Sequence, residues 1–332
     1  MPVGSRERCT LFLGQRGMGK TALLLEIASH AMEMGYIVAR VTAHEGMPET
    51  IIEQIQLNGS HLFDKEKKHV SGLSAGILGF SFGLSFSESA QSQYGFRSKL
   101  SLLCDKLAEK GVGILILIDE VHTSAAMREV AATYQELVGD QKNIAIGMAG
   151  LPYAVSGVLN DKVLTFLNRA NKITLDPLSI ASIRAYFNYA FEELEIKCSD
   201  ELLDKAADAT MGLPYYMQLL GYYLVQYTKS ASSVDQEILE KAKVAATRDL
   251  NDNVFKPTLS PLSDNDRLFL KAMADCEEPV TIKELQEKLG EKGPAIQPYR
   301  KRLIEVGIIE SPRRGELVFS IPYFSEYLKN QT

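Results

Sequence analysis

The sequence contains few cysteines, no long apolar run and no excess of basic residues, and each absence excludes a class of protein. The four cysteines among 332 residues include no CxxC pair, which argues against a disulfide framework and against a cysteine-rich zinc site. The histidines show no metal-ligand spacing either. The longest uninterrupted apolar run, residues 114–118, is far shorter than the ~20 residues that a membrane helix needs.

The charge balance is mildly acidic, with 36 Lys and Arg residues against 42 Asp and Glu residues and a formal net charge of −6. This balance excludes a protein that coats nucleic acid by bulk charge, and it leaves a local basic patch open. Hydrophobic residues make up 45% of the chain, as in an ordinary soluble globular protein. Residues 1–8 are polar and do not resemble a secretory signal, so we expect a cytoplasmic location and no membrane partner.

Short apolar runs alternate with stretches of helical periodicity from residue 9 to about residue 175. This alternation is typical of βαβ units, in which helices cover both faces of a parallel sheet. The sequence therefore predicts the α/β class, with an αβα core at residues 1–176. Glycines and alternating phenylalanines at 71–87 predict a β-hairpin inserted at about 70–90, which packs on its own domain or touches a partner.

The strand pattern then stops, and residues 177–255 show helical patterns only, which predicts an all-α lid. Three polar residues are placed to cap the starts of these helices: Ser179, Ser199 and either Ser233 or Asp235.

Residues 251–262 contain two prolines and predict a linker to a further unit. Residues 260–332 follow the order helix, helix, turn, helix and hairpin, which is typical of a winged-helix domain. A capping box of Thr281 and Glu284 marks the start of the second helix, and Gly290 is placed to end it.

The strongest motif is the sequence GQRGMGKT at residues 14–21, which matches GxxxxGK[ST] between an expected strand and an expected helix. Backbone N–H groups of such a loop wrap phosphates, and the helix N-terminus adds a favourable dipole. Lys20 is expected to reach the β- and γ-phosphates, and the Thr21 hydroxyl to bind Mg²⁺. The residues expected to bind ATP or ADP are Gly14, Gln15, Arg16, Gly17, Met18, Gly19, Lys20, Thr21 and Ala22.

Two acidic residues directly follow the buried run at 114–118. Because parallel strands end at the same edge of a sheet, Asp119 and Glu120 are expected beside the phosphate loop. Asp119 would hold Mg²⁺ through water, and Glu120 would polarise the attacking water. The alternative is a solvated acid pair that only ends a strand. With the phosphate loop nearby, the pair favours hydrolysis of ATP over phosphoryl transfer to a small acceptor.

These motifs resemble those of the AAA+ and STAND ATPases, in particular the replication-initiator-like group with a C-terminal winged helix. The resemblance covers nearly the whole chain and implies a P-loop NTPase core, a helical lid and a DNA-binding winged helix. Gly212-Leu213-Pro214 resembles the GxP motif of these families, in which the proline lies near the nucleotide. The alternative for Pro214 is an ordinary helix start.

Arg169 falls where such families place an arginine finger, which acts in cis or from a neighbouring subunit. The alternative is a surface arginine or an ion-pair partner. Two departures from the family pattern predict slow hydrolysis. The fourth strand ends in Gly147-Met148-Ala149-Gly150 where a polar residue is usual, and the lid helix after Pro214 lacks the common sensor arginine.

The third helix and the hairpin of the C-terminal region carry basic and amide side chains that suit a major groove flanked by phosphates. The helical periodicity predicts that Gln297, Arg300 and Lys301 face outward from the third helix. The residues expected to contact DNA are these three together with Arg313 and Arg314 of the hairpin. The alternative is a winged helix that contacts protein.

Together these features predict a slow, Mg²⁺-dependent ATPase that acts as a nucleotide-controlled switch and engages duplex DNA. The expected partners are ATP or ADP, duplex DNA, and further copies of the chain or a partner protein. The alternative function is a STAND-type signalling switch with little turnover, whose winged helix contacts protein.

Overall fold

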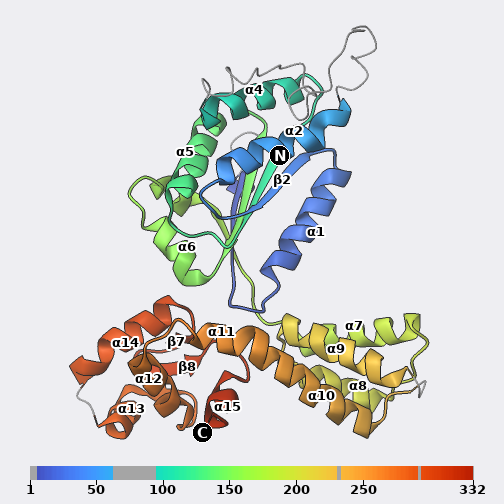
Figure 1. Ribbon diagram of the computed structural model, residues 1–332, viewed down its shortest axis with the longest axis vertical. Helices are drawn as coiled ribbons and strands as arrows, with labels where there is room; N and C mark the ends of the chain where they lie inside the picture. Colours follow the sequence, from blue (N-terminus) through green and yellow to red (C-terminus); the bar gives the residue numbers. More distant parts are fainter. Residues whose placement is uncertain (1–5, 63–94, 230–232, 291–292, 332) are drawn as a thin grey trace. The chain divides into compact units, whose positions relative to one another are not determined.

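The structure is a computed structural model that describes residues 6–62, 95–229, 233–290 and 293–331. The expected hairpin at about 70–90 lies outside the described residues. The chain divides into two compact units (Figure 1). The first comprises the described residues of Met1–Leu13 and Lys20–Thr174, and the second comprises Gly14–Gly19 and those of Leu175–Thr332.

The first unit contains a five-stranded sheet in which every pairing is parallel, with the order β2-β3-β4-β1-β5. Its strands are β1 (Cys9–Leu13), β2 (Ile37–Thr42), β3 (Ile114–Asp119), β4 (Ile144–Gly150) and β5 (Asn171–Thr174). Its helices are α1 (Lys20–Glu33), α2 (Met47–Gly59), α4 (Phe96–Ala108), α5 (Ala125–Gly139) and α6 (Pro152–Leu159), with 3-10 turns at Arg6–Arg8, Ser60–Leu62 and Thr165–Arg169. The predicted α/β core with a parallel sheet is confirmed.

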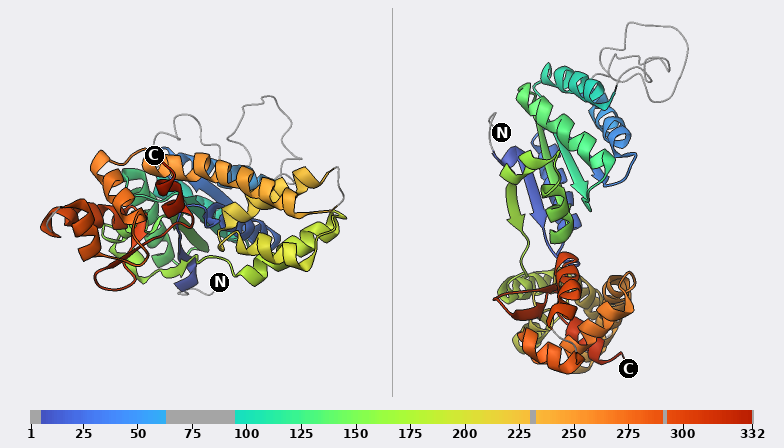
Figure 2. Two further views of the ribbon diagram at one scale, coloured as in Figure 1. Left: turned by 90° about the horizontal axis from the view of Figure 1, so that it is seen from below. Right: turned by 90° about the vertical axis from the view of Figure 1, so that its left-hand side faces the viewer.

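Helices cover both faces of this sheet (Figures 1 and 2). Successive side chains of a strand point to opposite faces, so Ile116 and Ile118 of β3 join one hydrophobic core and Leu117 joins the other. The first core also contains residues of α2, α4, α5 and α6, whereas α1 is the only helix of the described residues that packs in the second. This two-sided burial explains why the run at 114–118 is apolar throughout.

The outer edge of β2 is covered by polar side chains of α2. The backbone N–H of Arg40 donates to Gln54 Oε1 (2.7 Å), and Gln54 Nε2 donates back to the Arg40 carbonyl (2.9 Å). One helical turn after Gln54, Asn58 Nδ2 donates to the carbonyl of Val38, two residues before Arg40 in β2 (2.8 Å). The amide groups of two helix residues therefore satisfy backbone groups that a neighbouring strand would otherwise bond.

The second unit contains helices followed by a small antiparallel sheet, and one hydrophobic core runs through it from α7 to α15. Its helices are α7 (Ile180–Glu193), α8 (Asp200–Asp208), α9 (Pro214–Thr228), α10 (Gln236–Leu250), α11 (Lys256–Leu259), α12 (Asp264–Ala274), α13 (Ile282–Leu289), α14 (Gly293–Glu305) and α15 (Phe324–Lys329). Its strands are β6 (Val280–Thr281), β7 (Ile309–Glu310) and β8 (Glu316–Phe319), in the order β6-β8-β7. The division into a lid at 177–255 and a domain at 260–332 stays a prediction.

The caps expected from the sequence are present in this unit. Ser179, Ser199 and Asp235 each accept a hydrogen bond from a backbone N–H of the first helical turn. Thr281 and Glu284 form the predicted capping box of α13, which ends at Gly290 in the left-handed conformation.

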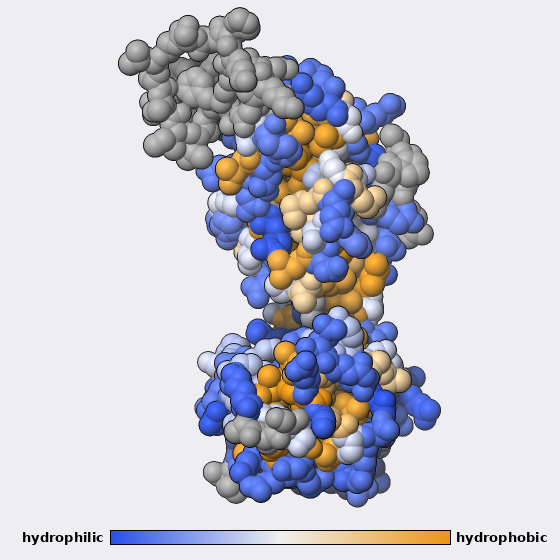
Figure 3. Space-filling view, turned by 90° about the vertical axis from the view of Figure 1, so that its right-hand side faces the viewer, coloured by the Kyte–Doolittle hydropathy of each residue, from blue (hydrophilic) through white to orange (hydrophobic). Residues whose placement is uncertain are grey.

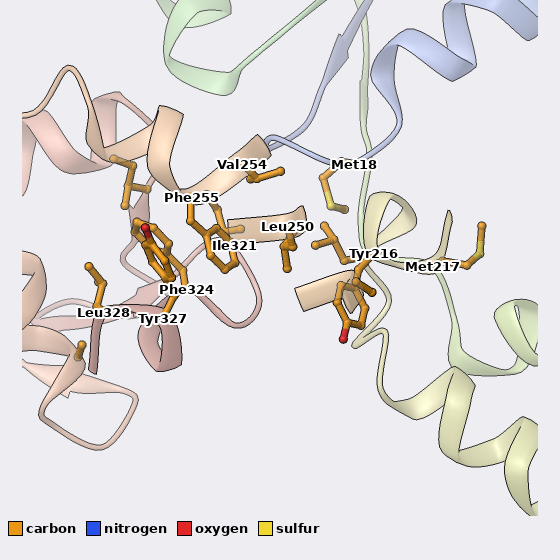
Figure 4. Close-up of a cluster of buried hydrophobic side chains, with 14 of the residues drawn as sticks. Met18, Tyr216, Met217, Leu250, Val254, Phe255, Ile321, Phe324, Tyr327 and Leu328 are labelled. Carbon is orange, nitrogen blue, oxygen red and sulfur yellow. The ribbon is translucent and has the colours of Figure 1, made fainter. Parts of the chain in front are cut away.

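The expected linker at 251–262 is helical up to Leu259, because α10 continues through a π-helical turn, Asn251–Phe255, into α11. Its role as a linker between two domains stays a prediction. Pro257 has no N–H to donate, and wider turns are a common accommodation of such a break in the helical ladder. Val254 and Phe255 of this segment are buried, and the Phe255 ring packs on the ring of Phe324 (Figure 4). Burial of these apolar side chains favours the helix despite the prolines.

A buried ion pair ties α12 to α14. The Arg302 guanidinium forms a two-pronged contact with Asp266, with nitrogen–oxygen distances of 2.5 to 3.1 Å, and the Asp266 side chain is only 2% exposed. Burial by itself raises the pKa of the Asp266 carboxyl. The hydrogen bonds from Arg302 and Ser263 outweigh this effect and hold the pKa below its ordinary value.

We expect Arg302→Ala to lower the free energy of unfolding by about 2 kcal/mol at pH 7, because the buried Asp266 carboxylate loses charge-assisted hydrogen bonds and keeps only those from Ser263. The lowered pKa means that the native pair contributes stability above pH ~4, the ordinary value for Asp, and loses it as the pH falls through the folded value. The loss of unfolding free energy caused by Arg302→Ala should therefore be smaller at pH 3 than at pH 7. Urea unfolding at both pH values measures it, and Lys301→Ala, an exposed neighbour on α14, is the control with an expected change within about 0.5 kcal/mol. An equal loss at both pH values would contradict the ion-pair explanation.

Hydrophilic side chains predominate on the face shown in Figure 3, with smaller hydrophobic patches on both units. Within the described ranges, no helix combines the length and the apolar character that crossing a bilayer requires.

Candidate nucleotide-binding site

The loop between β1 and α1 depends on two glycines. Gly17 and Gly19 have φ values of +80° and +79°, which glycine adopts without the strain that a Cβ atom causes. Loops with such alternating backbone conformations turn successive N–H groups toward an anion. Residues 14–19 group with the second unit, and the chain continues directly into α1 of the first unit at Lys20. The sequence motif thus has the local conformation that phosphate binding needs.

The start of α1 and the end of β3 meet in the first unit. The Thr21 hydroxyl donates a hydrogen bond to Asp119 Oδ2 (2.6 Å), although 98 residues separate the two in the chain. The second carboxylate oxygen accepts from the backbone N–H of Glu120 (2.9 Å), and Asp119 is 9% exposed. The strand order places β4 between β1 and β3, so this contact spans a strand that contributes to neither motif.

Glu120 has an unusual backbone conformation. Its φ is +54°, which costs a residue with a Cβ atom roughly 1–2 kcal/mol. The turn leaves Asp119 and Val121 buried on either side while Glu120 itself is exposed, and Val121 N donates to the Ala149 carbonyl (2.9 Å). His122, also exposed, contacts the Glu120 carbonyl through Nδ1 (3.1 Å). Strain of this kind at the end of a core strand is typical of functional sites.

The glycines at the end of β4 have a packing reason. A Cβ atom on Gly150 would lie 2.8 Å from Val121 Cγ2, and one on Gly147 would lie 2.8 Å from Leu117 Cδ2. The side chains of β3 and its following turn therefore occupy the space that a polar residue of β4 would need. This packing, which the sequence did not indicate, accounts for the missing polar residue.

Pro214 lies beside the phosphate loop within the second unit. Tyr215 N donates to the Gly17 carbonyl (3.1 Å), and a Cβ atom on Gly19 would lie 3.8 Å from Pro214 Cβ. The Leu213-Pro214-Tyr215 segment at the start of α9 therefore packs on the loop, as its resemblance to a GxP motif implied. Its role toward a nucleotide stays a prediction.

Sequence reasoning missed a second neighbour of this loop. A Cβ atom on Gly307, which has φ +69°, would lie 2.6 Å from Gln15 Oε1. The Gln15 side chain thus lies directly against the backbone between α14 and β7. The sequence indicates only that Gly307 ends a helix. No sequence pattern could have predicted its contact with Gln15.

Arg169 lies at the end of the sheet where β5 begins. It precedes β5, which pairs in parallel with β1 from Thr10↔Asn171 to Leu13↔Thr174. Arg169 therefore comes before the first paired residue of β5, whereas Asp119 ends β3 at the opposite end of the same sheet. Arg169 is exposed, and its action in cis or from a neighbouring subunit stays a prediction.

The side chains expected to contact DNA divide into two groups. Gln297 and Lys301 on α14 are exposed, as are Arg313 and Arg314 between β7 and β8. Arg300 is half-buried, because its guanidinium bonds to Gln297 Oε1 (3.3 Å) and Ser311 Oγ (3.4 Å). The expectation that Arg300 faces outward is thus wrong, since this arginine joins α14 to the β7–β8 turn.

Thr21 and Asp119 supply the hydroxyl and carboxylate oxygens that Mg²⁺ prefers, and they lie within hydrogen-bond distance of each other. In the described part of the chain no group of three His, Cys, Asp or Glu residues is arranged to hold a metal. Mg²⁺ that is shared with a substrate phosphate needs only one or two protein oxygens, so these residues fit that ion.

Comparisons with known proteins bear on the fold. Residues 252–328 match a family described as a domain of unknown function (DUF8462), and no curated protein matches the chain. The structure is similar to a Walker-type ATPase of Pyrococcus abyssi, at 16% identity and a TM-score of 0.65 over 97% of this chain and 91% of that one. It is also similar to the Aeropyrum pernix ORC2 protein solved as ADPNP–ADP complexes, at 13% identity and a TM-score of 0.61 over 97% and 87% of the two chains. At these identities the likeness shows the fold alone.

Proposed function

We propose that this protein is a slow Mg²⁺-dependent ATPase whose nucleotide state controls engagement of duplex DNA. The observation that carries the proposal is the 2.6 Å hydrogen bond between Thr21 and Asp119, because it joins the end of the phosphate-loop motif to the acidic strand end. Lys20 directly precedes Thr21 and binds the β- and γ-phosphates in this proposal.

Each residue at this edge has a distinct task. Thr21 and Asp119 hold Mg²⁺, which when bound neutralises charge on the phosphate oxygens. Glu120 is exposed next to Asp119 and orients a water for attack on the γ-phosphate, accepting a proton from it. The glycines that end β4 contribute no polar group to that water, which supports slow turnover.

The arginine finger of this proposal comes from a neighbouring subunit. Arg169 precedes β5 at the end of the sheet opposite Asp119, which favours that role in trans, so in this proposal turnover depends on contact between copies of the chain or with a partner protein. Dilution below the dissociation constant should then lower the specific activity.

The contacts of the phosphate loop support its coupling to the rest of the second unit. Gly17 bonds to Tyr215 at the start of α9, and Gln15 lies against Gly307 between α14 and β7. A nucleotide that reshapes the loop therefore changes both contacts, and through them the lid and the C-terminal region.

The C-terminal elements support the winged-helix assignment. Their order α12, β6, α13, α14, β7 and β8, with β8 paired to both other strands, matches that motif. Exposed Gln297 and Lys301 on α14 then face a groove, and Arg313 and Arg314 contact the flanking phosphates.

The decisive experiment measures ATP hydrolysis by the full chain alone, with duplex DNA and with single-stranded DNA. We expect stimulation by duplex DNA. Arg313→Ala with Arg314→Ala should weaken duplex binding and lower its salt slope by about 2, roughly one per lost phosphate contact. Lys241→Ala, an exposed lysine on α10, is the matched control and should bind as the parent does. No binding to any duplex at low salt would refute the DNA part.

A second candidate is a signalling switch whose C-terminal region contacts protein. Arg300 is held by Gln297 and Ser311, and Lys301 lies 3.7 Å from Glu305, which reduces the basic charge that α14 offers to DNA. This candidate predicts near-zero turnover with or without DNA and a nucleotide-dependent change in oligomer size. Size-exclusion chromatography with ADP and a non-hydrolysable ATP analogue distinguishes it from the first.

A further inference from the structure

A cavity of about 320 Å³ lies between α11, α12 and α15 in the second unit. Its wall includes three basic residues: Lys256, Arg267 and Lys271. They come from two helices that are separated by a turn, so the fold and not a sequence run brings their charges together. The whole wall lies between residues 256 and 331, away in the chain from the phosphate-loop motif.

Within the residues that the structure describes, two of these three charges have no acidic partner. Lys256 pairs with Asp252 (2.6 Å), whereas Arg267 donates to the Ser260 carbonyl (3.2 Å) and Lys271 to the Gln331 carbonyl (3.2 Å). Neither Arg267 nor Lys271 forms an ion pair with any residue of the described ranges. Backbone carbonyls satisfy single N–H groups but do not neutralise a full charge, so the cavity has a positive potential that favours an anion.

A buried hydroxyl also lies on this wall. Tyr327 is 8% exposed, and its buried hydroxyl forms no hydrogen bond of normal geometry within the described residues, although the Gln331 side chain lies beside it. A buried donor that is poorly satisfied costs stability, so a ligand oxygen in the pocket would be a better partner for it. Figure 4 shows Tyr327 beside Phe255 and Phe324, whose rings hold its own ring in place.

Two leucines and the polar residues Ser260 and Gln331 complete the wall. Leu259 and Leu328 are 7% and 4% exposed and line the same cavity. Apolar walls exclude water, which strengthens the attraction between the basic residues and an anion. The volume is at the lower end of the range of roughly 300–1,000 Å³ that is usual for small-molecule pockets, so the ligand is small.

We infer that this pocket binds a small phosphorylated molecule with one or two phosphate groups. Arg267 and Lys271 pair with the phosphate oxygens, the Tyr327 hydroxyl donates to them, and the leucines contact the rest of the ligand. The pocket is separate from the ATP site, and its residues lie almost wholly within the segment 252–328 that matches DUF8462. The inference does not depend on ATP hydrolysis.

The test titrates pyrophosphate into the full-length Lys20→Ala variant by isothermal titration calorimetry, because that substitution weakens phosphate binding at the loop. We expect one binding site per chain. Arg267→Gln with Lys271→Gln should weaken it at least about tenfold, and Tyr327→Phe by about three- to tenfold, as expected for hydrogen bonds to a charged group. Lys283→Gln, an exposed lysine on α13 outside the pocket, is the matched control and should leave the affinity unchanged.

Thermal unfolding of each variant checks that the fold is intact, and Tyr327→Phe, which changes one atom, keeps the test valid if the double variant is destabilised. No binding of pyrophosphate, or binding that none of these substitutions weakens, would overturn the inference. Displacement of pyrophosphate by a short DNA duplex would assign the pocket to a nucleic-acid backbone and would also overturn it. A parent protein that binds pyrophosphate in this pocket but does not hydrolyse ATP would count against the proposed function alone.

Discussion

Lys20→Ala should weaken binding of MgATP by about 10- to 100-fold. The ammonium group of Lys20 is expected to contact the phosphates directly, and charge-assisted hydrogen bonds of that kind contribute about 1.5–3 kcal/mol. Isothermal titration calorimetry with MgATP measures the effect. The fold should be unaffected, because Lys20 is the first residue of α1 and is not in either hydrophobic core of its unit.

The matched control for this substitution is Lys106→Ala on α4 of the same unit. Lys106 lies 3.6 Å from Glu109 at the surface, and its loss should leave MgATP affinity unchanged. Equal affinity of the Lys20→Ala protein and the parent would mean that the loop does not bind a triphosphate. The glycine conformations of residues 17 and 19 would then need another explanation.

Glu120→Gln should lower ATP turnover by about 10²- to 10⁴-fold and leave MgATP affinity within a few-fold of the parent value, because a general base acts on the chemical step. The amide keeps the size and backbone preference of the glutamate, so the left-handed turn is maintained. Glu129→Gln, an exposed glutamate on α5, is the control and should hydrolyse ATP at the parent rate. A parent rate for Glu120→Gln itself would show that another group accepts the proton.

Glu120→Gly separates the chemical role of this residue from its backbone strain. Glycine adopts a φ of +54° freely, so this variant should be more stable than the parent by about 1 kcal/mol while it is equally inactive. Thermal unfolding measures the gain. A protein that becomes more stable when it loses its glutamate would indicate that the strain is tolerated for function.

Much of the core could be predicted from the sequence because local patterns determine it. A run that is apolar throughout, such as 114–118, fits only a strand buried on both faces, and Ser179, Ser199 and Asp235 cap helices through contacts within one turn. The loop glycines and the Thr21–Asp119 contact also follow from a motif and from the shared edge of parallel strands.

Features that depend on contacts far apart in the sequence could not be predicted in this way. The prolines at 251–262 indicated a linker, yet the burial of Val254 and Phe255 keeps the segment helical. Helical periodicity predicted that Arg300 faces outward from α14. It could not predict the hydrogen bond from Arg300 to Ser311 in the turn that follows β7. The basic pocket joins Arg267 of α12 to Tyr327 of α15, and no sequence pattern relates these positions.

The amide side chains of α2 have a further consequence for assembly. Exposed strand edges invite pairing with another chain, which leads to aggregation, and proteins commonly block them. Gln54 and Asn58 occupy the hydrogen-bonding groups of Arg40 and Val38 as an additional strand would, so β2 offers little template for an intermolecular sheet. Edge pairing between copies of this chain at β2 would first have to break these three hydrogen bonds.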